Sequence, residues 1–176
     1  LDNAATTPVR PEVEEVMQPY FCEKYGNPSG IYKMASECRQ ALETVRKQIG
    51  KTLKVSAEEI YFTSGGTESD NWAIKSTAQR LKEKGKHIIT SKIEHHAVLN
   101  SCAYLETQGF EVTYLDVDSE GIVDLDQLEE SIREDTILVS CMMVNNEIGA
   151  IEPIEEIAKI IKAKNPNTIF HVDAIQ

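Results

Sequence analysis

The sequence contains no long apolar run, and none approaches the ~18–20 residues that a membrane-spanning helix needs. Positive charge is also scarce, with 18 lysines and arginines against 29 aspartates and glutamates and a formal net charge of −11. Nucleic acids and anionic membranes both bind basic surfaces, so this balance argues against both as partners. We interpret the excess acid as a solubilising surface, and an acidic patch that recruits a basic partner is the alternative.

Cysteines are few and lack a metal-binding or redox pattern. Cys22, Cys38, Cys102 and Cys141 are scattered along the chain, and no C-x-x-C pair occurs. We therefore expect free thiols in a reducing cytosol. Cys38 and Cys102 fall on the apolar stripes of predicted helices and Cys141 in a predicted strand, so packing is the expected role.

The spacing of apolar residues alternates between helical and strand-like along the 176 residues, which suffice for one domain with a substantial core. Helices are predicted over 11–24, 34–49, 67–84, 97–108, 125–133 and 153–164, and strands over 60–63, 87–91, 111–115, 136–144 and 168–172. Ser56 and Glu59 have the spacing of a capping box for a short helical turn, and Asp124 is the expected N-cap of the helix over 125–133. This order predicts an α/β fold, with a mostly parallel sheet, helices on both faces and right-handed crossovers. Residues 1–50 are predicted to form a helical arm and residues 51–176 a larger domain.

A glycine-rich turn, Thr63–Ser69 (TSGGTES), joins a predicted strand to a predicted helix. Two glycines let backbone N–H groups approach a ligand closely, and the following helix N-terminus favours an anion. The turn is neither a Walker A loop nor a G-x-G-x-x-G motif. It therefore predicts a phosphate cradle, although an ordinary strand-to-helix turn with a capping threonine has the same appearance.

Polar side chains follow three other predicted strands. His95, after strand 87–91, could stack on a flat ring, move a proton or bind a metal, or could be structural. Asn145 and Asn146 follow strand 136–144 and could donate to a ligand oxygen or simply form a turn. Asp173 ends the last strand, where a buried carboxylate needs a partner such as a protonated ring nitrogen, a helix cap or a metal.

The joint pattern is more informative than any of its parts. The carboxyl ends of parallel strands meet at one edge of a sheet, which is where such folds bind ligands. A phosphate cradle, an aromatic stacker, an amide and an acid at that edge are the parts that bind a phosphorylated pyridine. The acid would keep the ring nitrogen protonated, so that the ring becomes an electron sink.

Strings that run in order along the whole chain resemble those of NifS/IscS-type cysteine desulfurases, in the class V aminotransferase family. They are LDNAATTP at 1–8, GNPS at 26–29, FTSGGTESDN at 62–71, ITS at 89–91 with Glu94-His95, VNNEIG at 144–149 and HVDAIQ at 171–176. The resemblance implies pyridoxal 5′-phosphate (PLP) as cofactor and a fold-type-I PLP enzyme, with residues 51–176 as part of its large domain.

The resemblance also implies roles by motif position. Gly66 and Thr67 would hold the phosphate, and His95 would stack on the pyridine ring and assist proton transfer. Asp173 would pair with the pyridine nitrogen, and Asn146 and Gln176 would reach the phenolic oxygen of the ring. Ala5, Thr6 and Asn27 would lie near the substrate.

The implied reaction takes sulfur from L-cysteine, leaves L-alanine and forms an enzyme persulfide. The sulfur then passes to an iron–sulfur cluster scaffold protein or to tRNA thiolation, and the enzyme is a cytoplasmic homodimer with active sites near the subunit interface. A selenocysteine lyase or another class V PLP enzyme is the alternative within the family. A non-catalytic fragment that binds a partner is the alternative outside it.

The sequence departs from the family pattern in two respects. Tyr32 and Ala35 stand where many relatives carry a histidine and a glycine, which affects the expected substrate contacts. The lysine that carries the cofactor and the cysteine that accepts the sulfur have no counterpart here, and Lys92 is not that lysine. We therefore expect this chain to be roughly the first half of a longer enzyme and to be inactive alone.

Overall fold

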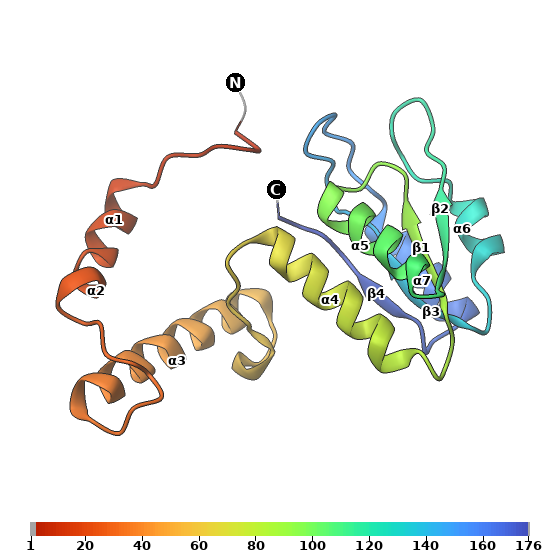
Figure 1. Ribbon diagram of the computed structural model, residues 1–176. Coiled ribbons are helices and arrows are strands. Elements are labelled where there is room, and N and C mark those ends of the chain that lie inside the picture. The colour runs from red at the N-terminus through yellow and green to blue at the C-terminus, as the bar shows by residue number, and fades with distance from the viewer. Residues whose placement is uncertain (1–2, 176) are drawn as a thin grey trace. The chain divides into compact units, whose positions relative to one another are not determined.

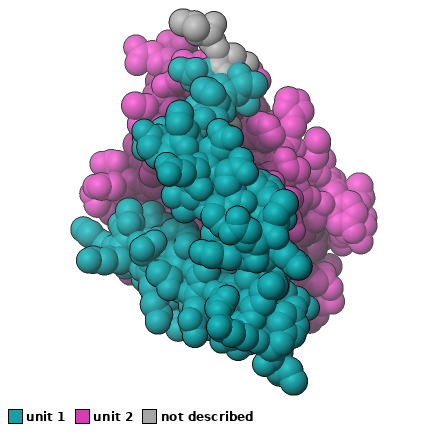
Figure 2. All heavy atoms as spheres, turned by 90° about the vertical axis from the view of Figure 1, so that its left-hand side faces the viewer, with its two compact units in different colours: residues 1–62 teal, residues 63–176 magenta. Residues whose placement is uncertain are grey.

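The computed structural model describes residues 3–175 and divides into two compact units, residues 1–62 and residues 63–176. Figure 2 colours the first unit teal and the second magenta. The functional division into an arm of residues 1–50 and a domain of residues 51–176 remains a prediction. Within residues 3–175, no helix combines the length and the apolar character that a membrane crossing requires.

The first unit is helical. It contains α1 (Pro11–Met17), α2 (Pro19–Cys22), α3 (Lys33–Leu53) and the 3-10 helix η1 (Ala57–Glu59). The single helix predicted over 11–24 is wrong because Pro19 has no N–H group to continue α1, and instead occupies the first position of α2. Apolar side chains of this segment are exposed, with Val16 68% and Phe21 66% accessible.

Helix α3 runs past Gly50, where the sequence predicted its end, and continues to Leu53. Lys54 then adopts a left-handed conformation, with φ of 58°. The N–H of Val55 donates to the carbonyl of Gly50 at 2.9 Å, and a Cβ atom at Gly50 would lie 2.8 Å from the carbonyl oxygen of Val55. Gly50 therefore permits the chain to return closely against its own helix.

The segment after α3 contains one correct and one wrong prediction. The predicted capping box is confirmed, since the N–H of Ser56 donates to Oε2 of Glu59 at 2.7 Å. The strand predicted over 60–63 does not form. Its first carbonyl, on Ile60, accepts a hydrogen bond from Nε of Arg46 at 3.3 Å, so a side chain of α3 takes a group that a sheet partner would need.

The second unit is built on a parallel sheet, as predicted. Its strands are β1 (His87–Ser91), β2 (Glu111–Leu115), β3 (Thr136–Ser140) and β4 (Ile169–His171), in the order β2-β1-β3-β4. All three neighbouring pairs are parallel. The last two strands are shorter than predicted, so the polar residues after them lie in loops beyond the ladder.

Helices cover both faces of this sheet (Figure 1). Helices α4 (Gly66–Leu81) and α5 (His96–Thr107) pack on the face that carries Ile88. Helices α6 (Leu125–Ser131) and α7 (Ile154–Lys164) pack on the opposite face, with Ile89. Successive strand side chains point to opposite faces, so the apolar run in β1 serves both cores and confirms the predicted α/β class. Cys38, Cys102 and Cys141 are buried as expected, whereas Cys22 is exposed.

Strand β1 has β2 on one side and β3 on the other. The chain passes from β1 to β2 on one side and then crosses to β3 on the other side of β1. In open α/β sheets this switch point leaves a crevice outside the carboxyl ends of the two strands, where ligands bind. The loops after β1 and β3 border that crevice.

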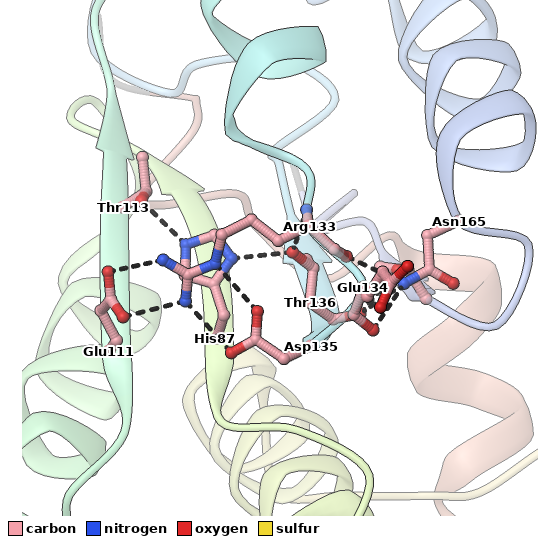
Figure 3. A network of polar contacts seen from close by, with 9 residues as sticks. His87, Glu111, Thr113, Arg133, Glu134, Asp135, Thr136 and Asn165 are labelled. Carbon is pink, nitrogen blue, oxygen red and sulfur yellow. Dashed lines mark hydrogen bonds and ion pairs between the residues drawn. The ribbon is translucent and has the colours of Figure 1, made fainter.

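The amino-terminal edge of the sheet is closed by a polar network (Figure 3). The ring of His87 is buried between the hydroxyl groups of Thr113 and Thr136, each 2.8 Å from a ring nitrogen. The Arg133 guanidinium forms a bidentate pair with Glu111 at 2.8 and 2.9 Å. These contacts join the starts of β1, β2 and β3, at the edge opposite the crevice.

Candidate functional site

Helix α4 begins at the glycine-rich turn, at Gly66. The carboxylate of Glu68 accepts hydrogen bonds from the backbone N–H of Ser64 at 2.6 Å and from its hydroxyl group at 2.7 Å, which lowers the pKa of Glu68. Because the first N–H groups of a helix have no partner within it, those of Gly66 and Thr67 are available to an anion.

The end of the chain packs on this turn. A Cβ atom at Gly66 would lie 2.8 Å from Cγ1 of Ile175, so a larger residue at this position would displace the Ile175 side chain. Ile175 also donates its N–H to Oδ1 of Asp173 at 3.0 Å. The carboxyl group of Asp173 is 5% exposed, and its backbone carbonyl accepts from the N–H of Met143 at 2.8 Å. A buried acid therefore lies between the turn and the loop after β3.

A second buried acid, Asp70, lies one helical turn after Thr67 and was missed by the sequence analysis. Its Oδ1 is 3.6 Å from Nε2 of His171, and burial together with the negative charge of Asp173 raises the pKa of Asp70 to about 6. Spacing could have indicated both residues. Positions three apart share a helix face, which relates Asp70 to Thr67, and two residues separate His171 from Asp173 in a segment predicted to be extended.

His95 directly precedes α5 and caps it. Its Nδ1 accepts the backbone N–H of Ala97 at 3.1 Å. A ring nitrogen that accepts carries no proton, so the proton of the neutral ring is on Nε2. His95 lines a hollow of about 280 Å³ together with Lys92, Glu94, His96, Asn145 and Asn146. The hollow brings together two predicted site residues, His95 and Asn146, from separate loops.

The two asparagines have different surroundings. Asn145 is buried, donates from Nδ2 to the carbonyl of Ile93 at 2.8 Å, and accepts at Oδ1 from the N–H groups of Glu147 and Ile148 at 2.8 and 3.0 Å. It therefore holds the loop together. Asn146 is half-buried at the hollow, where its amide can meet a ligand.

Glu94 is a buried carboxyl group. The sequence pattern names it beside His95 but assigns it no role. Its Oε1 accepts from the hydroxyl of Ser91 at 2.7 Å and from the N–H of Met142 at 2.9 Å. Its Oε2 is buried and finds no hydrogen-bond partner among the described residues. Burial raises the pKa of Glu94 to about 7.

The remaining predicted residues are not among the described residues of the second unit. Ala5, Thr6 and Asn27 belong to the first unit, and Gln176 lies outside the described residues. Oδ1 of Asn27 accepts the N–H of Ser29 at 3.0 Å, and the hydroxyl of Tyr32 accepts the N–H of Asn27 at 3.0 Å. Tyr32 thus supports the turn that carries Asn27.

The donor set of the second unit suits a phosphorylated, flat, basic ring better than a metal. Within residues 3–175, no three histidine, cysteine or acidic side chains are grouped so as to hold a metal ion. The helix N-terminus at Gly66 can bind a phosphate, His95 offers a ring face, and Asp173 offers a buried negative charge. PLP fits this set.

Comparisons with known proteins agree on one family. The family model described as aminotransferase class-V matches residues 1–176. Two curated relatives called cysteine desulfurase IscS, from Methanosarcina thermophila and Dictyoglomus turgidum, are 58% and 57% identical over 176 residues. These matches cover 100% of this chain and 43% and 44% of the relatives, so the chain spans less than half the length of the curated relatives it matches.

Solved structures of similar fold belong to related proteins. A structure titled NifS-like protein has a TM-score of 0.97 and 47% identity, covering 99% of this chain and 48% of that one. A structure titled SspA in complex with cysteine has a TM-score of 0.93 and 42% identity, covering 98% of this chain and 49% of that one. The arrangement of helices and strands is therefore that of NifS-like PLP enzymes of fold type I.

Proposed function

Because the chain belongs to the class-V aminotransferase family, we propose that it is the main PLP-binding portion of a cysteine desulfurase. The observation that carries the proposal is the gathering of the Gly66 turn, His95, Asn146 and Asp173 at the carboxyl-terminal edge of one parallel sheet. The names of the curated relatives support the same activity for the whole protein.

Each end of the cofactor has a suitable partner. The N–H groups of Gly66 and Thr67 bind the phosphate, helped by the partial positive charge of the α4 N-terminus. The carboxylate of Asp173 pairs with the pyridine nitrogen and favours its protonated form, because a buried negative charge is weakly screened. When bound, PLP supplies a ring that accepts electrons from the substrate.

The side chains that border the hollow orient the ring. The imidazole of His95 stacks on it, and its Nε2 proton can be exchanged with a reacting group. Asn146 and Gln176 reach the phenolic oxygen, which fixes the rotation of the ring in its plane. Ala5, Thr6 and Asn27 contribute to the substrate side of the site.

The proposed reaction of the whole protein takes L-cysteine as substrate. The C–S bond of cysteine breaks, L-alanine leaves, and an enzyme thiol becomes a persulfide that passes its sulfur to a scaffold protein or to tRNA thiolation. The reaction also needs the cofactor lysine and the acceptor cysteine of the family, and neither has a counterpart among residues 1–176. A cytoplasmic homodimer is the expected form, and the cysteine complex of a 42% identical relative supports the substrate class.

The test is a turnover assay on the full-length protein with PLP, L-cysteine and a reducing thiol. We expect alanine and sulfide in equal amounts, because the thiol reduces the persulfide. Glu111→Gln, at the opposite edge of the sheet, serves as the control and keeps the activity. Absence of alanine from L-cysteine would contradict the proposal, and alanine from L-selenocysteine alone would assign a selenocysteine lyase instead.

A further inference from the structure

Two reciprocal hydrogen bonds join the loops that follow β1 and β3. Glu94, on the first loop, accepts at Oε1 the N–H of Met142 on the second loop at 2.9 Å. Asn145, on the second loop, donates from Nδ2 to the carbonyl of Ile93 on the first loop at 2.8 Å. Each loop thus uses one side chain to hold the backbone of the other.

The two side chains directly precede the residues assigned to the cofactor, since Glu94 precedes His95 and Asn145 precedes Asn146. We propose that Glu94 and Asn145, the loop clamp, are positioning residues that set His95 and Asn146 at the spacing that PLP requires. This inference rests on the proposed function. It assigns a role to two residues that the proposed function gives no part in holding the cofactor.

The paired parts of β1 and β3 end before His95 and Asn146, so strand pairing alone does not set the spacing of these two residues. The residue-by-residue pairing of β1 with β3 ends at Thr90 and Ser140. His95 and Asn146 lie five and six residues beyond those ends, in loops separated by many residues of intervening chain. Backbone hydrogen bonds tie each loop to its other neighbour, since the N–H of Lys92 donates to Leu115 and that of Met143 donates to Asp173. The contacts that join the two loops to each other are those of the side chains of Glu94 and Asn145. The loop clamp extends the constraint from the ladder to the rim of the hollow.

Asn145 has the hydrogen bonding of a positioning residue. Its Oδ1 accepts from the N–H groups of Glu147 and Ile148, which fixes the turn that contains Asn146. Its Nδ2 donates to Ile93 and lies 3.4 Å from Sδ of Met142. Both Oδ1 and Nδ2 of Asn145 therefore bond to protein atoms, and the side chain stabilises the turn.

Glu94 retains a polar group at a site where polarity is costly. Its side chain is 4% exposed, and Oε2 has no hydrogen-bond partner among residues 3–175. An unpaired buried oxygen is destabilising, because it has lost its hydrogen bonds to water and gained none in return. An apolar residue would avoid that cost but could not accept the N–H of Met142. The cost is offset if the carboxyl group fixes the two loops, and burial favours its neutral form, which glutamine resembles.

The experiment measures the dissociation constant of PLP by absorbance titration of the full-length apoprotein, with the melting temperature of each apoprotein alongside. Asn145→Asp keeps the acceptor for the turn and replaces the donor to Ile93 with a repelling oxygen. Glu94→Ala removes the other half of the loop clamp, and Glu94→Gln restores an acceptor. Glu152→Ala is the matched control, because Glu152 is also buried, accepts one backbone N–H and has an unpartnered oxygen.

Both clamp variants are then made in a His95→Ala/Asn146→Ala background, which lacks the side chains that the clamp positions. In the otherwise native protein we expect Asn145→Asp and Glu94→Ala to weaken PLP binding about tenfold, a coupling typical of residues in one network. In the His95→Ala/Asn146→Ala protein the same changes should weaken PLP binding by less than about threefold. Glu94→Gln should bind nearly as tightly as the wild type, and Glu152→Ala should lower the melting temperature and leave PLP binding unchanged.

The loop clamp is refuted if both variants bind PLP like the wild type, or if they lose as much affinity in the background as in the native protein. Asn145→Asp is nearly isosteric and carries the test if Glu94→Ala fails to fold. A wild-type protein that binds PLP while the clamp variants are unaffected refutes the clamp alone. A wild-type protein that binds no PLP refutes the proposed function and the clamp with it.

Discussion

Nε2 of His171 lies 3.6 Å from Oδ1 of Asp70, so strand β4 contacts the first turns of helix α4 beside Asp173. Nδ1 of the same ring is 2.9 Å from the hydroxyl of Ser140 on β3. Burial lowers the pKa of His171, although Asp173 opposes this shift. The pKa of Asp70 is raised to about 6, so near neutral pH the contact joins a carboxylate to a neutral imidazole and is not an ion pair.

Asp70→Asn is expected to change the pH dependence of stability. The folded pKa of Asp70, about 6, is above its ordinary value, so its stabilising contribution is complete below about pH 4 and is lost as pH rises through 6. The amide does not ionise. The variant should therefore be the more stable protein at pH 7.5, by on the order of 1 kcal/mol after allowance for solvent screening.

Urea unfolding of the full-length protein at pH 4.5 and pH 7.5 measures this effect. The advantage of Asp70→Asn over the wild type should shrink at the lower pH. An equal difference at both values would show that Asp70 ionises normally in the fold.

His87→Gln is expected to have the opposite pH dependence. Burial and the charge of Arg133 lower the pKa of His87, so its contribution is present above the unfolded pKa of about 6.5 and is lost as pH falls below it. At pH 7.5 the variant should lose about 1–3 kcal/mol, because one of the two threonine hydroxyls, of which that of Thr136 is buried, loses its partner.

Melting temperatures of both proteins from pH 5 to pH 8 test this prediction, and the gap between them should narrow toward pH 5. The account of the network in Figure 3 is wrong if the gap is constant. Turnover should be unchanged, since His87 is at the amino-terminal edge of the sheet.

Gly50→Ala should destabilise the protein although alanine is the better helix former by about 1 kcal/mol. The new Cβ atom would lie 2.8 Å from the carbonyl oxygen of Val55, and a backbone atom cannot move aside cheaply. A net loss of about 1–2 kcal/mol in unfolding free energy is expected. Gln48→Ala, at an exposed position of the same helix, separates loss of the close return from general damage to α3. A more stable Gly50→Ala protein would contradict the geometry.

Local signals predicted the second unit well. The apolar runs of β1 to β4 and the cap at Asp124 depend on neighbouring residues, and the structure contains them. The capping box at Ser56, in the first unit, was predictable for the same reason. The glycine-rich turn and His95 were found for the same reason, since both stand directly at the ends of recognisable elements. Their roles toward PLP remain proposals.

Long-range pairings were not predictable from the pattern. Glu94 and Met142 are 48 positions apart, and no spacing rule indicates that one accepts the N–H of the other. Apolar residues recur at helical spacing over 11–24, but an amphipathic pattern does not specify what covers the apolar face, and Val16 and Phe21 are exposed. The break before Pro19, by contrast, was available from the sequence, because proline cannot continue a hydrogen-bonded helix.

The central claim is that Asp173 holds the pyridine nitrogen of PLP in a desulfurase, and Asp173→Asn in the full-length protein tests it most directly. The amide keeps the size and the acceptor for Ile175 but removes the buried charge. We expect the variant to bind PLP with an altered absorbance spectrum and to form alanine from L-cysteine about 100-fold more slowly, as for loss of one preorganised electrostatic partner. A variant with the spectrum and alanine-forming rate of the wild type would contradict the account.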